Sequence, residues 1–348
     1  MEDIIIELED DNNHLYPKED QNFPKRDLII SNESRALSKD IKETIEEAKR
    51  FADISHAKNT KLAYTKDWEH FTTWCKAKNL DNLPAKPQTI ALYFTDYANE
   101  YKVSTLERKL SAIGTIHRNA GYFFDPKHIA FQRVFRGIKR EKGAARKGKD
   151  PLMVDQLKLI CEKEPENIKD IRDRAILLLG FSMASRRSEI VNLTVDDIKY
   201  VDEGLQVIIR KSKSDQEGHG RTVGVPYGTN QNTCPVYWLE KWIDEAKVEE
   251  GFIFKKINRW GHIDNNPETH LSDKAVNLIV KEHLERVGIN PDAFGAHSLR
   301  AGHVTSAAAA DVPEWIIQKQ TGHKRADTLR GYIRMGELFK KNSSNGML

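Results

Sequence analysis

The chain has 348 residues, enough for two domains, and its 39% hydrophobic and 31% charged residues are typical of a soluble globular protein. It has no run of 18 apolar residues, which excludes a transmembrane helix, and its acidic start lacks the basic flank and long apolar stretch of a signal peptide. The three cysteines, Cys75, Cys161 and Cys234, are far apart, which favours reduced thiols in a cytosol over disulfides or a zinc site.

The net charge of +3 hides an uneven distribution along the chain. Residues 1–45 hold 12 acidic and 6 basic residues, a net charge of −6, so the remainder carries +9. Residues 1–37 also lack hydrophobic periodicity, and we predict a flexible acidic segment there. Residues 133–149 contain eight basic residues and one acid, a composition typical of a polyanion-binding surface and also of a solvated linker. The eight are Arg133, Arg136, Lys139, Arg140, Lys142, Arg146, Lys147 and Lys149.

Residues 38–140 have a helical pattern throughout. Apolar residues recur at three-to-four spacing in residues 41–52, and a second predicted helix covers residues 59–79. Further helices are predicted over residues 87–100 and 104–121, so we expect an all-helical bundle. The second helix carries an apolar stripe that we expect in the core, formed by Tyr64, Trp68, Phe71 and Cys75 with Trp74 beside it.

Residues 141–150 combine glycine, alanine and basic charge, and we predict a basic linker between two domains. Helices follow, one of them running over residues 168–193 with a long apolar stretch that predicts burial. The hydrophobic period then changes. Residues 204–214 and 220–228 are rich in β-forming residues and predict a hairpin with a long polar tip.

Helices resume after the hairpin. The one over residues 271–288 has Ser272 at its expected N-cap and Gly288 past its end. The alternation of helices with one hairpin predicts an α+β domain with a small antiparallel sheet over residues 151–338, followed by a short tail over residues 339–348. The predicted fold class is therefore mainly α, with a helical bundle followed by this α+β domain.

The stretch FGAHSLRAGHVTSAAAA, residues 294–310, places His297 and Arg300 three residues apart, so both lie on one face of a helix made otherwise of small residues. Such a pair by itself is typical of a protein surface. The second half of the chain, however, presents polar groups beside apolar anchors in several other segments. These are Arg186 and Arg187 in ASRRSEIVNL, Lys211 and Lys213 in the hairpin, His323 in TGH, and Tyr332 nine residues later.

The order Arg, Lys, HxxR, GH and Tyr resembles that of the tyrosine recombinases, also called the phage integrase family. RRSEIVNL resembles the first arginine box of this family, HSLRAGHVTSAAAA its HxxR box, and KQTGHKRADTLRGYIR its final segment. NTKLAYTKDWEHFTTWC resembles part of the core-binding domain, which the resemblance implies for residues 38–140. The resemblance covers about residues 38–340 and is closest to the Cre-like and Xer-like members.

The resemblance also implies the site residues. Arg186 matches the first catalytic arginine because it stands three before Glu189, whereas Arg187 falls where the family has an apolar or small residue. Lys213 matches the hairpin lysine, with Lys211 as a rival because hairpin registers are uncertain by a residue or two. The implied catalytic set is Arg186, Lys213, His297, Arg300, His323 and Tyr332, with Glu189 helping to hold the site.

The chemistry of these residue types agrees with phosphodiester cleavage by a side chain. Such a reaction needs a nucleophile that forms a stable ester, positive charge on the non-bridging oxygens, and groups that move protons. The resemblance implies that Tyr332 attacks the phosphorus, Arg186 and Arg300 clamp the phosphate, and Lys213 protonates the leaving 5′ oxygen. It also implies that His297 is a base or phosphate donor and that His323 hydrogen-bonds a non-bridging oxygen.

The expected activity is site-specific DNA recombination through a 3′-phosphotyrosine, without ATP, cofactor or metal. Two alternatives stay open at this point: a type IB topoisomerase-like enzyme and a non-catalytic DNA-binding regulator. The resemblance implies double-stranded DNA with a specific target site as the partner and a tetramer on paired sites, with no membrane association and with accessory proteins left open. It places the protein in the cytoplasm, on the nucleoid.

Overall fold

The computed structural model describes residues 39–54, 58–143, 148–212, 215, 218–323 and 329–333. The chain divides into two compact units, with the division between Lys147 and Gly148. Several segments discussed above lie outside the described residues. These are the predicted flexible segment 1–37, the predicted tail 339–348, and Arg146, Lys147 and Lys213.

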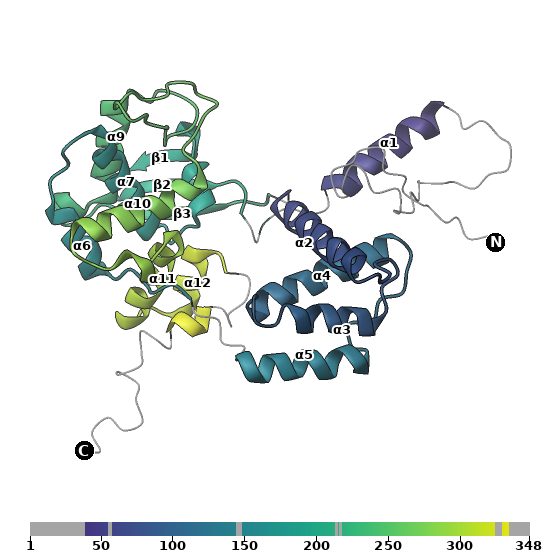
Figure 1. The fold of residues 1–348 in the computed structure, drawn as a ribbon. Coiled ribbons are helices and arrows are strands. Elements are labelled where there is room, and N and C mark those ends of the chain that lie inside the picture. Colours follow the sequence, from purple (N-terminus) through teal and green to yellow (C-terminus); the bar gives the residue numbers. More distant parts are fainter. Residues whose placement is uncertain are drawn as a thin grey trace, which may run out of the picture. The chain divides into compact units, whose positions relative to one another are not determined.

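The regular secondary structure described in the first unit is all helical (Figure 1), as its sequence pattern predicts. Its core is aromatic. Trp68, Phe71 and Cys75 of the predicted stripe are buried and pack against Tyr93 and Phe94. The helices are α1 (Lys39–Ile54), α2 (Lys58–Ala77), α3 (Pro87–Asp96), α4 (Val103–Asn119) and α5 (Ile129–Lys142).

The predicted helix over residues 41–52 is present as α1, in which Ile41 is 41% exposed. The end of another helix differs from expectation. Helix α5 continues to Lys142 and so includes residues that the sequence assigns to a linker. Its apolar face explains this, because Phe131, Phe135 and Ile138 recur at helical spacing and are buried in the core.

The second unit combines helices with one three-stranded antiparallel sheet in the order β1-β2-β3 (Figure 1), which confirms the predicted fold class. The predicted hairpin is β2 and β3, and its register pairs Ile209 with Arg221. Strand β1 was not predicted, because four residues are too few for a clear alternating pattern. The strands are β1 (Ile198–Val201), β2 (Gly204–Ile209) and β3 (Arg221–Pro226). The helices are α6 (Val154–Glu162), α7 (Ile168–Ser182), α8 (Arg187–Val191), α9 (Pro235–Ala246), α10 (Asp273–Arg286), α11 (Ala296–Ala309) and α12 (Glu314–Thr321).

Helix α7 is the buried centre of this unit and packs against α9 and α11. The prediction of one helix over residues 168–193 is wrong, because α7 ends at Ser182 and α8 begins only at Arg187. Between them Ala184 has the left-handed φ of 48°, which an α-helix cannot contain. Arg186 therefore lies at the start of a new helix rather than at the end of the old one.

The predicted ends of α10 are confirmed. Ser272 is its N-cap and accepts a hydrogen bond from the Ala275 amide, and Gly288 follows the helix with φ 77°. The small residues of α11 reflect close packing: a Cβ atom on Gly302 would lie 1.7 Å from the carbonyl oxygen of Leu152. Within the described residues, no helix is both long and apolar enough to span a membrane.

Candidate active site

The break between α7 and α8 creates the first part of the site. Arg186 is the N-cap residue of α8, and Glu189 is the third residue of that helix. The Glu189 carboxylate accepts one hydrogen bond from the Arg186 amide at 3.1 Å and another from Arg186 Nη1 at 2.6 Å. The bond from the amide is one half of a helix capping box, in which the carboxylate of the third helical residue accepts from the N-cap amide. The Arg186 side chain can only donate, so an ion pair takes the place of the other half, and the local fold holds the arginine and its counterion together.

A further arginine shares the same carboxylate. Arg221, the first residue of β3, donates from Nη2 to Glu189 Oε2 at 3.1 Å. The Glu189 side chain is 1% exposed, and those of Arg186 and Arg221 are 21% and 18% exposed. Two guanidinium groups therefore surround one buried carboxylate, and their net charge is positive.

Helix α11 brings in Arg300, whose residue is 2% exposed. Its Nη1 donates to the carbonyl oxygen of Ala184 at 2.6 Å, and its Nη2 lies 3.1 Å from His323 Nε2. Burial, together with the charge of Arg186, lowers the pKa of Arg300 to about 10. Both described hydrogen-bond partners are uncharged, so this guanidinium remains available to an anion.

His323 follows α12 and is held in one tautomer by its neighbours. An arginine can only donate, so Nε2 must accept and the ring proton must lie on Nδ1. Nδ1 is 2.7 Å from Thr321 Oγ1, which is in turn 2.8 Å from the Ile317 carbonyl oxygen. Burial and the neighbouring cations, Arg300 first, lower the pKa of His323 to about 4. The ring is therefore neutral at pH 7.

Tyr332 meets His297 at the start of α11. His297 Nε2 and the Tyr332 hydroxyl oxygen are 2.9 Å apart. The tyrosine lies on a helical turn over residues 329–333 and packs against a small cluster that includes Val304 and Ile317. Burial raises the pKa of Tyr332, while the charge of Arg300 opposes this shift. Burial and the charges of Arg300 and Arg186 lower the pKa of His297, which favours a neutral imidazole able to accept the phenol proton.

Five of the six sequence-predicted catalytic residues are described, and hydrogen bonds together with mutual charge effects place them in one cluster. Arg300 contacts His323, Arg186 shares Glu189 with Arg221, and the charges of Arg300 and Arg186 act on His297. The sixth, Lys213, lies outside the described residues. Its rival, Lys211, is exposed, and its aliphatic chain runs beside Gly218.

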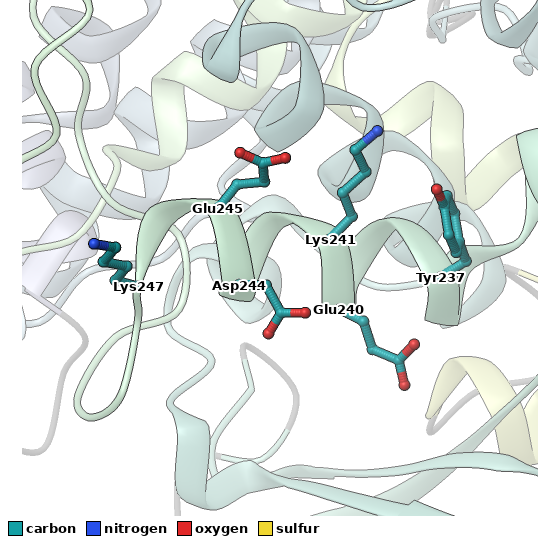
Figure 2. Close-up of a pocket in the computed structure, with 6 residues that line it drawn as sticks. All are labelled: Tyr237, Glu240, Lys241, Asp244, Glu245 and Lys247. Atoms are coloured by element: carbon teal, nitrogen blue, oxygen red, sulfur yellow. The ribbon is translucent and has the colours of Figure 1, made fainter.

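Arg187, the weaker match in the first arginine box, and Tyr237 both lie apart from the cluster. The Arg187 side chain forms an ion pair with Asp273 of α10 at 3.0 Å, with half of its surface exposed. Tyr237 lines a shallow groove along α9. Figure 2 shows Glu240 and Asp244 extending to the opposite side of that helix from Lys241 and Glu245, so these charged groups do not converge on one ligand. The groove is lined by Tyr237, Glu240, Lys241, Asp244, Glu245 and Lys247, and it includes none of the cluster residues.

The basic residues predicted to bind DNA fall into four groups. Arg133, Arg136 and Arg140 are exposed on one face of α5, opposite its buried aromatic residues. Lys139 pairs with Glu107 at 2.8 Å and Lys142 contacts Asn99, so both also have structural partners. In the second unit, Lys149 donates to the Asp292 carbonyl oxygen. The remaining two, Arg146 and Lys147, lie outside the described residues.

Sequence reasoning missed Arg221 and Ala184. Arg221 follows a Gly-His-Gly run at the return of the hairpin, and the β2–β3 register is what brings it to Glu189. Nothing in the sequence marks Ala184, since alanine is not a residue that favours a left-handed conformation. Within the described residues, no group of three or more His, Cys, Asp or Glu side chains is arranged to hold a metal ion.

Comparison with known proteins agrees with this geometry. Residues 151–337 match the phage integrase family. The integrase/recombinase xerD homolog of Selenomonas ruminantium is 38% identical over 304 residues, which cover 86% of this chain and 88% of that protein. Tyrosine recombinase XerA of Pyrococcus horikoshii is 26% identical over 63% of this chain and 72% of its own length.

Solved structures show the same fold. The XerH site-specific recombinase bound to a palindromic difH substrate, in a post-cleavage complex, superposes with a TM-score of 0.60. The two are 16% identical, and the match covers 88% of this chain and 82% of that one. A lambda integrase tetramer bound to a Holliday junction superposes with a TM-score of 0.53 at 14% identity, covering 85% and 78% of the two chains.

Proposed function

The chain belongs to the phage integrase family and is a tyrosine-type site-specific DNA recombinase, as its sequence predicts; we propose that it cleaves and rejoins DNA through a 3′-phosphotyrosine formed on Tyr332. The single observation that carries this proposal is the contact of 2.9 Å between the Tyr332 hydroxyl and His297, beside the charge of Arg300. No comparison favours the type IB topoisomerase or the non-catalytic regulator.

In the first step the Tyr332 oxygen attacks the scissile phosphorus. The neutral His297 accepts the phenol proton at Nε2, which turns a weak nucleophile into a phenolate-like one. The His297 ring is partly desolvated by its neighbours, but the residue keeps exposed surface, so it can exchange this proton with water afterwards. The bond from phosphorus to the 5′ oxygen breaks as the bond to the tyrosine forms.

Negative charge grows on the non-bridging oxygens as the phosphorus becomes five-coordinate, and arginines offset it. Arg186 and Arg300 are the proposed clamp, because both guanidinium groups keep their charge at neutral pH and can donate in pairs to phosphate oxygens. Arg300 uses one donor on the Ala184 carbonyl oxygen and one on His323, and neither partner is an acid. The neutral His323 accepts from Arg300 at Nε2 and faces Thr321 with Nδ1, so in this state it takes part by fixing Arg300. To hydrogen-bond a phosphate oxygen it must release Arg300 and carry a proton on Nε2.

The leaving 5′ oxygen needs a proton. Lys213 at the hairpin tip is the proposed acid, and Lys211 is the alternative if the tip adopts another register. The tyrosine ester retains the energy of the broken phosphodiester bond, so the 5′ hydroxyl of a partner strand can reverse the step without ATP. The carboxylate of Glu189 holds the site together by its contacts with two arginines.

We further propose how the chain engages DNA. Residues 38–140 form the DNA-binding core domain, and the exposed face of α5 with Arg133, Arg136 and Arg140 contacts the phosphate backbone. Contacts of this kind position the protein and carry no sequence information. A tetramer on paired target sites, located on the nucleoid in the cytoplasm, belongs to the same proposal.

The test starts from sheared genomic DNA of the organism that encodes the protein. The wild-type chain is incubated with these fragments, protein is denatured, and DNA that stays covalently attached is recovered and sequenced. We expect one enriched sequence. A duplex of that sequence with a nick near the cleavage point should then trap the protein in a stable covalent adduct. Tyr332→Phe should abolish the adduct. The control Tyr227→Phe changes an exposed tyrosine outside the cluster and should preserve it. A wild-type chain without any adduct, or an adduct that survives Tyr332→Phe, would contradict the proposal.

A further inference from the structure

Arg221 has no part in the chemistry described above, yet it lies where three parts of the site meet. It begins β3 at the loop end of the paired strands, opposite Ile209 of β2. Its side chain is 18% exposed, and its buried Nε has no acceptor among the described residues. Glu189 is the anionic partner that the described structure provides for it.

The first contact of Arg221 is with the counterion of Arg186. Arg186 binds Glu189 Oε1 at 2.6 Å, and Arg221 binds Glu189 Oε2 at 3.1 Å. One carboxylate oxygen thus orients the catalytic arginine while the other is held by Arg221. Without Arg221, Oε2 would keep its bond from the Arg186 amide but lose its charged partner, and the carboxylate would be free to turn toward Arg186.

The second contact is with the turn that presents His323. A Cβ atom on Gly322 would lie 2.8 to 3.1 Å from the guanidinium of Arg221, so the backbone there packs directly against it. Gly322 also has φ 66°, which favours glycine. A hydrogen bond also joins strand β3 to helix α12, because Gln320 Nε2 donates to the Gly224 carbonyl oxygen at 3.1 Å. Strand β3 is therefore fastened to the end of α12 at two points.

We propose that Arg221 is a positioning residue for DNA cleavage, which fixes Arg186 through the shared Glu189 carboxylate and fixes the Gly322–His323 turn by packing against it. Arg221 also directly follows the hairpin loop, whose sequence includes Lys213, so it connects Glu189 and the Gly322–His323 turn to that loop. The catalytic part of this inference rests on the proposed function. Its structural part does not, so the two can fail separately.

The first experiment needs no DNA. Arg221 is one of the cations that lower the pKa of His323, together with Arg300, Arg186 and His297. In an NMR titration of the imidazole, Arg221→Gln should raise the pKa of His323 relative to the wild type. The matched control is Arg210→Gln. Arg210 follows Ile209 at the same loop end of the hairpin, and it also pairs with a buried carboxylate, that of Asp197. The control should leave the pKa of His323 unchanged. An unchanged pKa in Arg221→Gln would overturn the assigned position.

The second experiment compares two nicked duplexes of the sequence recovered with wild-type protein. One has the natural scissile phosphodiester, and the other has a methylphosphonate there, which lacks the negative charge that arginines stabilise. Arg221→Gln should slow adduct formation on the phosphodiester by roughly 10- to 100-fold, the range for loss of part of an electrostatic clamp. On the methylphosphonate the loss should be only a few-fold. Arg221→Lys should be faster than Arg221→Gln, because lysine keeps a positive charge beside Glu189. It should be slower than the wild type, because lysine lacks the flat guanidinium that packs against Gly322.

Equal losses on both duplexes would overturn the proposal, because a general weakening of the fold slows every substrate alike. A double-mutant cycle with Glu189→Gln separates the remaining cases. If Arg221 acts through Glu189, the double variant should be about as slow as the slower single variant. Multiplying losses would mean that Arg221 contacts the phosphate itself, which would also overturn a positioning role. A wild-type chain that forms no adduct would refute the proposed function while the titration still tests the position of Arg221.

Discussion

The two units each contain a buried carboxylate between two cations, and the surroundings of these carboxylates differ. In the first unit Asp67 contacts Lys109 at 3.3 Å and also Arg108. Lys109 lies against the rings of Tyr93 and Tyr101, so its remaining surface is covered. This cluster is complete within the fold.

In the second unit Glu189 stands between Arg186 and Arg221 in the same way, but a third arginine lies beside them. Arg300 is bound only by a carbonyl oxygen and an imidazole among the described residues. The difference shows that buried charged groups in this chain have two roles. Where each cation reaches the carboxylate, the charges hold a fold together. Where a buried arginine has no carboxylate of its own among the described residues, as Arg300 has none, the charges form a site for an external anion.

The largest effect should come from Arg300→Met, which removes the excess charge. Adduct formation should fall at least about 1,000-fold, as for loss of an arginine that stabilises a phosphoryl transition state. The free energy of unfolding should change by less than about 1 kcal/mol, because removal of a buried charge without an acid offsets the loss of two hydrogen bonds. Quenched-time adduct assays and urea unfolding measure the two quantities. A strong destabilisation would show that this arginine is structural, like those of the first unit.

Asp67→Asn should have the converse outcome. Lys109 would remain buried without its charged partner, and such broken pairs destabilise proteins by about 3 kcal/mol. Hydrogen exchange of amides in α2 and α4 measures the loss within that unit. The control Asp155→Asn alters an exposed carboxylate, with 96% of its side chain open to solvent, and should have no effect. If Asp67→Asn proves as mild as Asp155→Asn, the contrast between the two clusters is wrong.

Acid should destabilise both units, and an anion should protect only the second. His323 in the second unit has its pKa lowered to about 4 by burial and by Arg300, and burial also lowers the pKa of His117 in the first. A lowered folded-state pKa means that the unfolded chain binds more protons below pH 6.5. The stability that depends on the neutral histidines should therefore be complete above that pH and be lost progressively as the pH falls below it toward the lowered pKa values.

Sulfate bound between the arginines would stabilise protonated His323 and reduce this loss in the second unit. Hydrogen exchange in α11 and α4, with and without sulfate, reports the two units in one sample. The first unit serves as the internal control for general salt effects. Equal protection of both helices would argue against an anion site in the second unit.

The smallest effect should come from Arg136→Gln on the exposed face of α5. Loss of one phosphate contact should lower DNA affinity about tenfold or less and reduce the slope of log affinity against log salt by about 1. Adduct formation at saturating protein should not change. Lys76→Gln, at an exposed position of α2, is the matched control. Binding titrations at several salt concentrations measure both slopes, and an unchanged slope for Arg136→Gln would remove α5 from the interface.

The sequence predicts those parts of the site that depend on local geometry. His297 and Arg300 share a helix face because they are three residues apart, and the spacing of Arg186 and Glu189 is that of a capping box. The order of motifs then predicts which family brings these segments together, and the comparisons confirm that family.

Other parts depend on contacts that no local pattern encodes. Arg221 reaches Glu189 only through the register of a hairpin, and residues 168–193 read as one helix because apolar periodicity continues across the break. The helical end of the basic segment was missed for the opposite reason. Its basic charge favoured the prediction of a linker, although Phe131, Phe135 and Ile138 provide a buried face at helical spacing.

The left-handed turn at Ala184 has a consequence for how substitutions there should behave. Arg300 is held by the main-chain oxygen of this residue, so no change of side chain can delete the bond directly. Only the backbone path matters, together with the lack of free volume at a residue that is 0% exposed. In a saturation screen position 184 should accept glycine and reject valine, isoleucine and threonine, which avoid positive φ most strongly. Such a profile would show that the backbone conformation at position 184 restricts which residue can stand there, although the side chain itself has no reactive group.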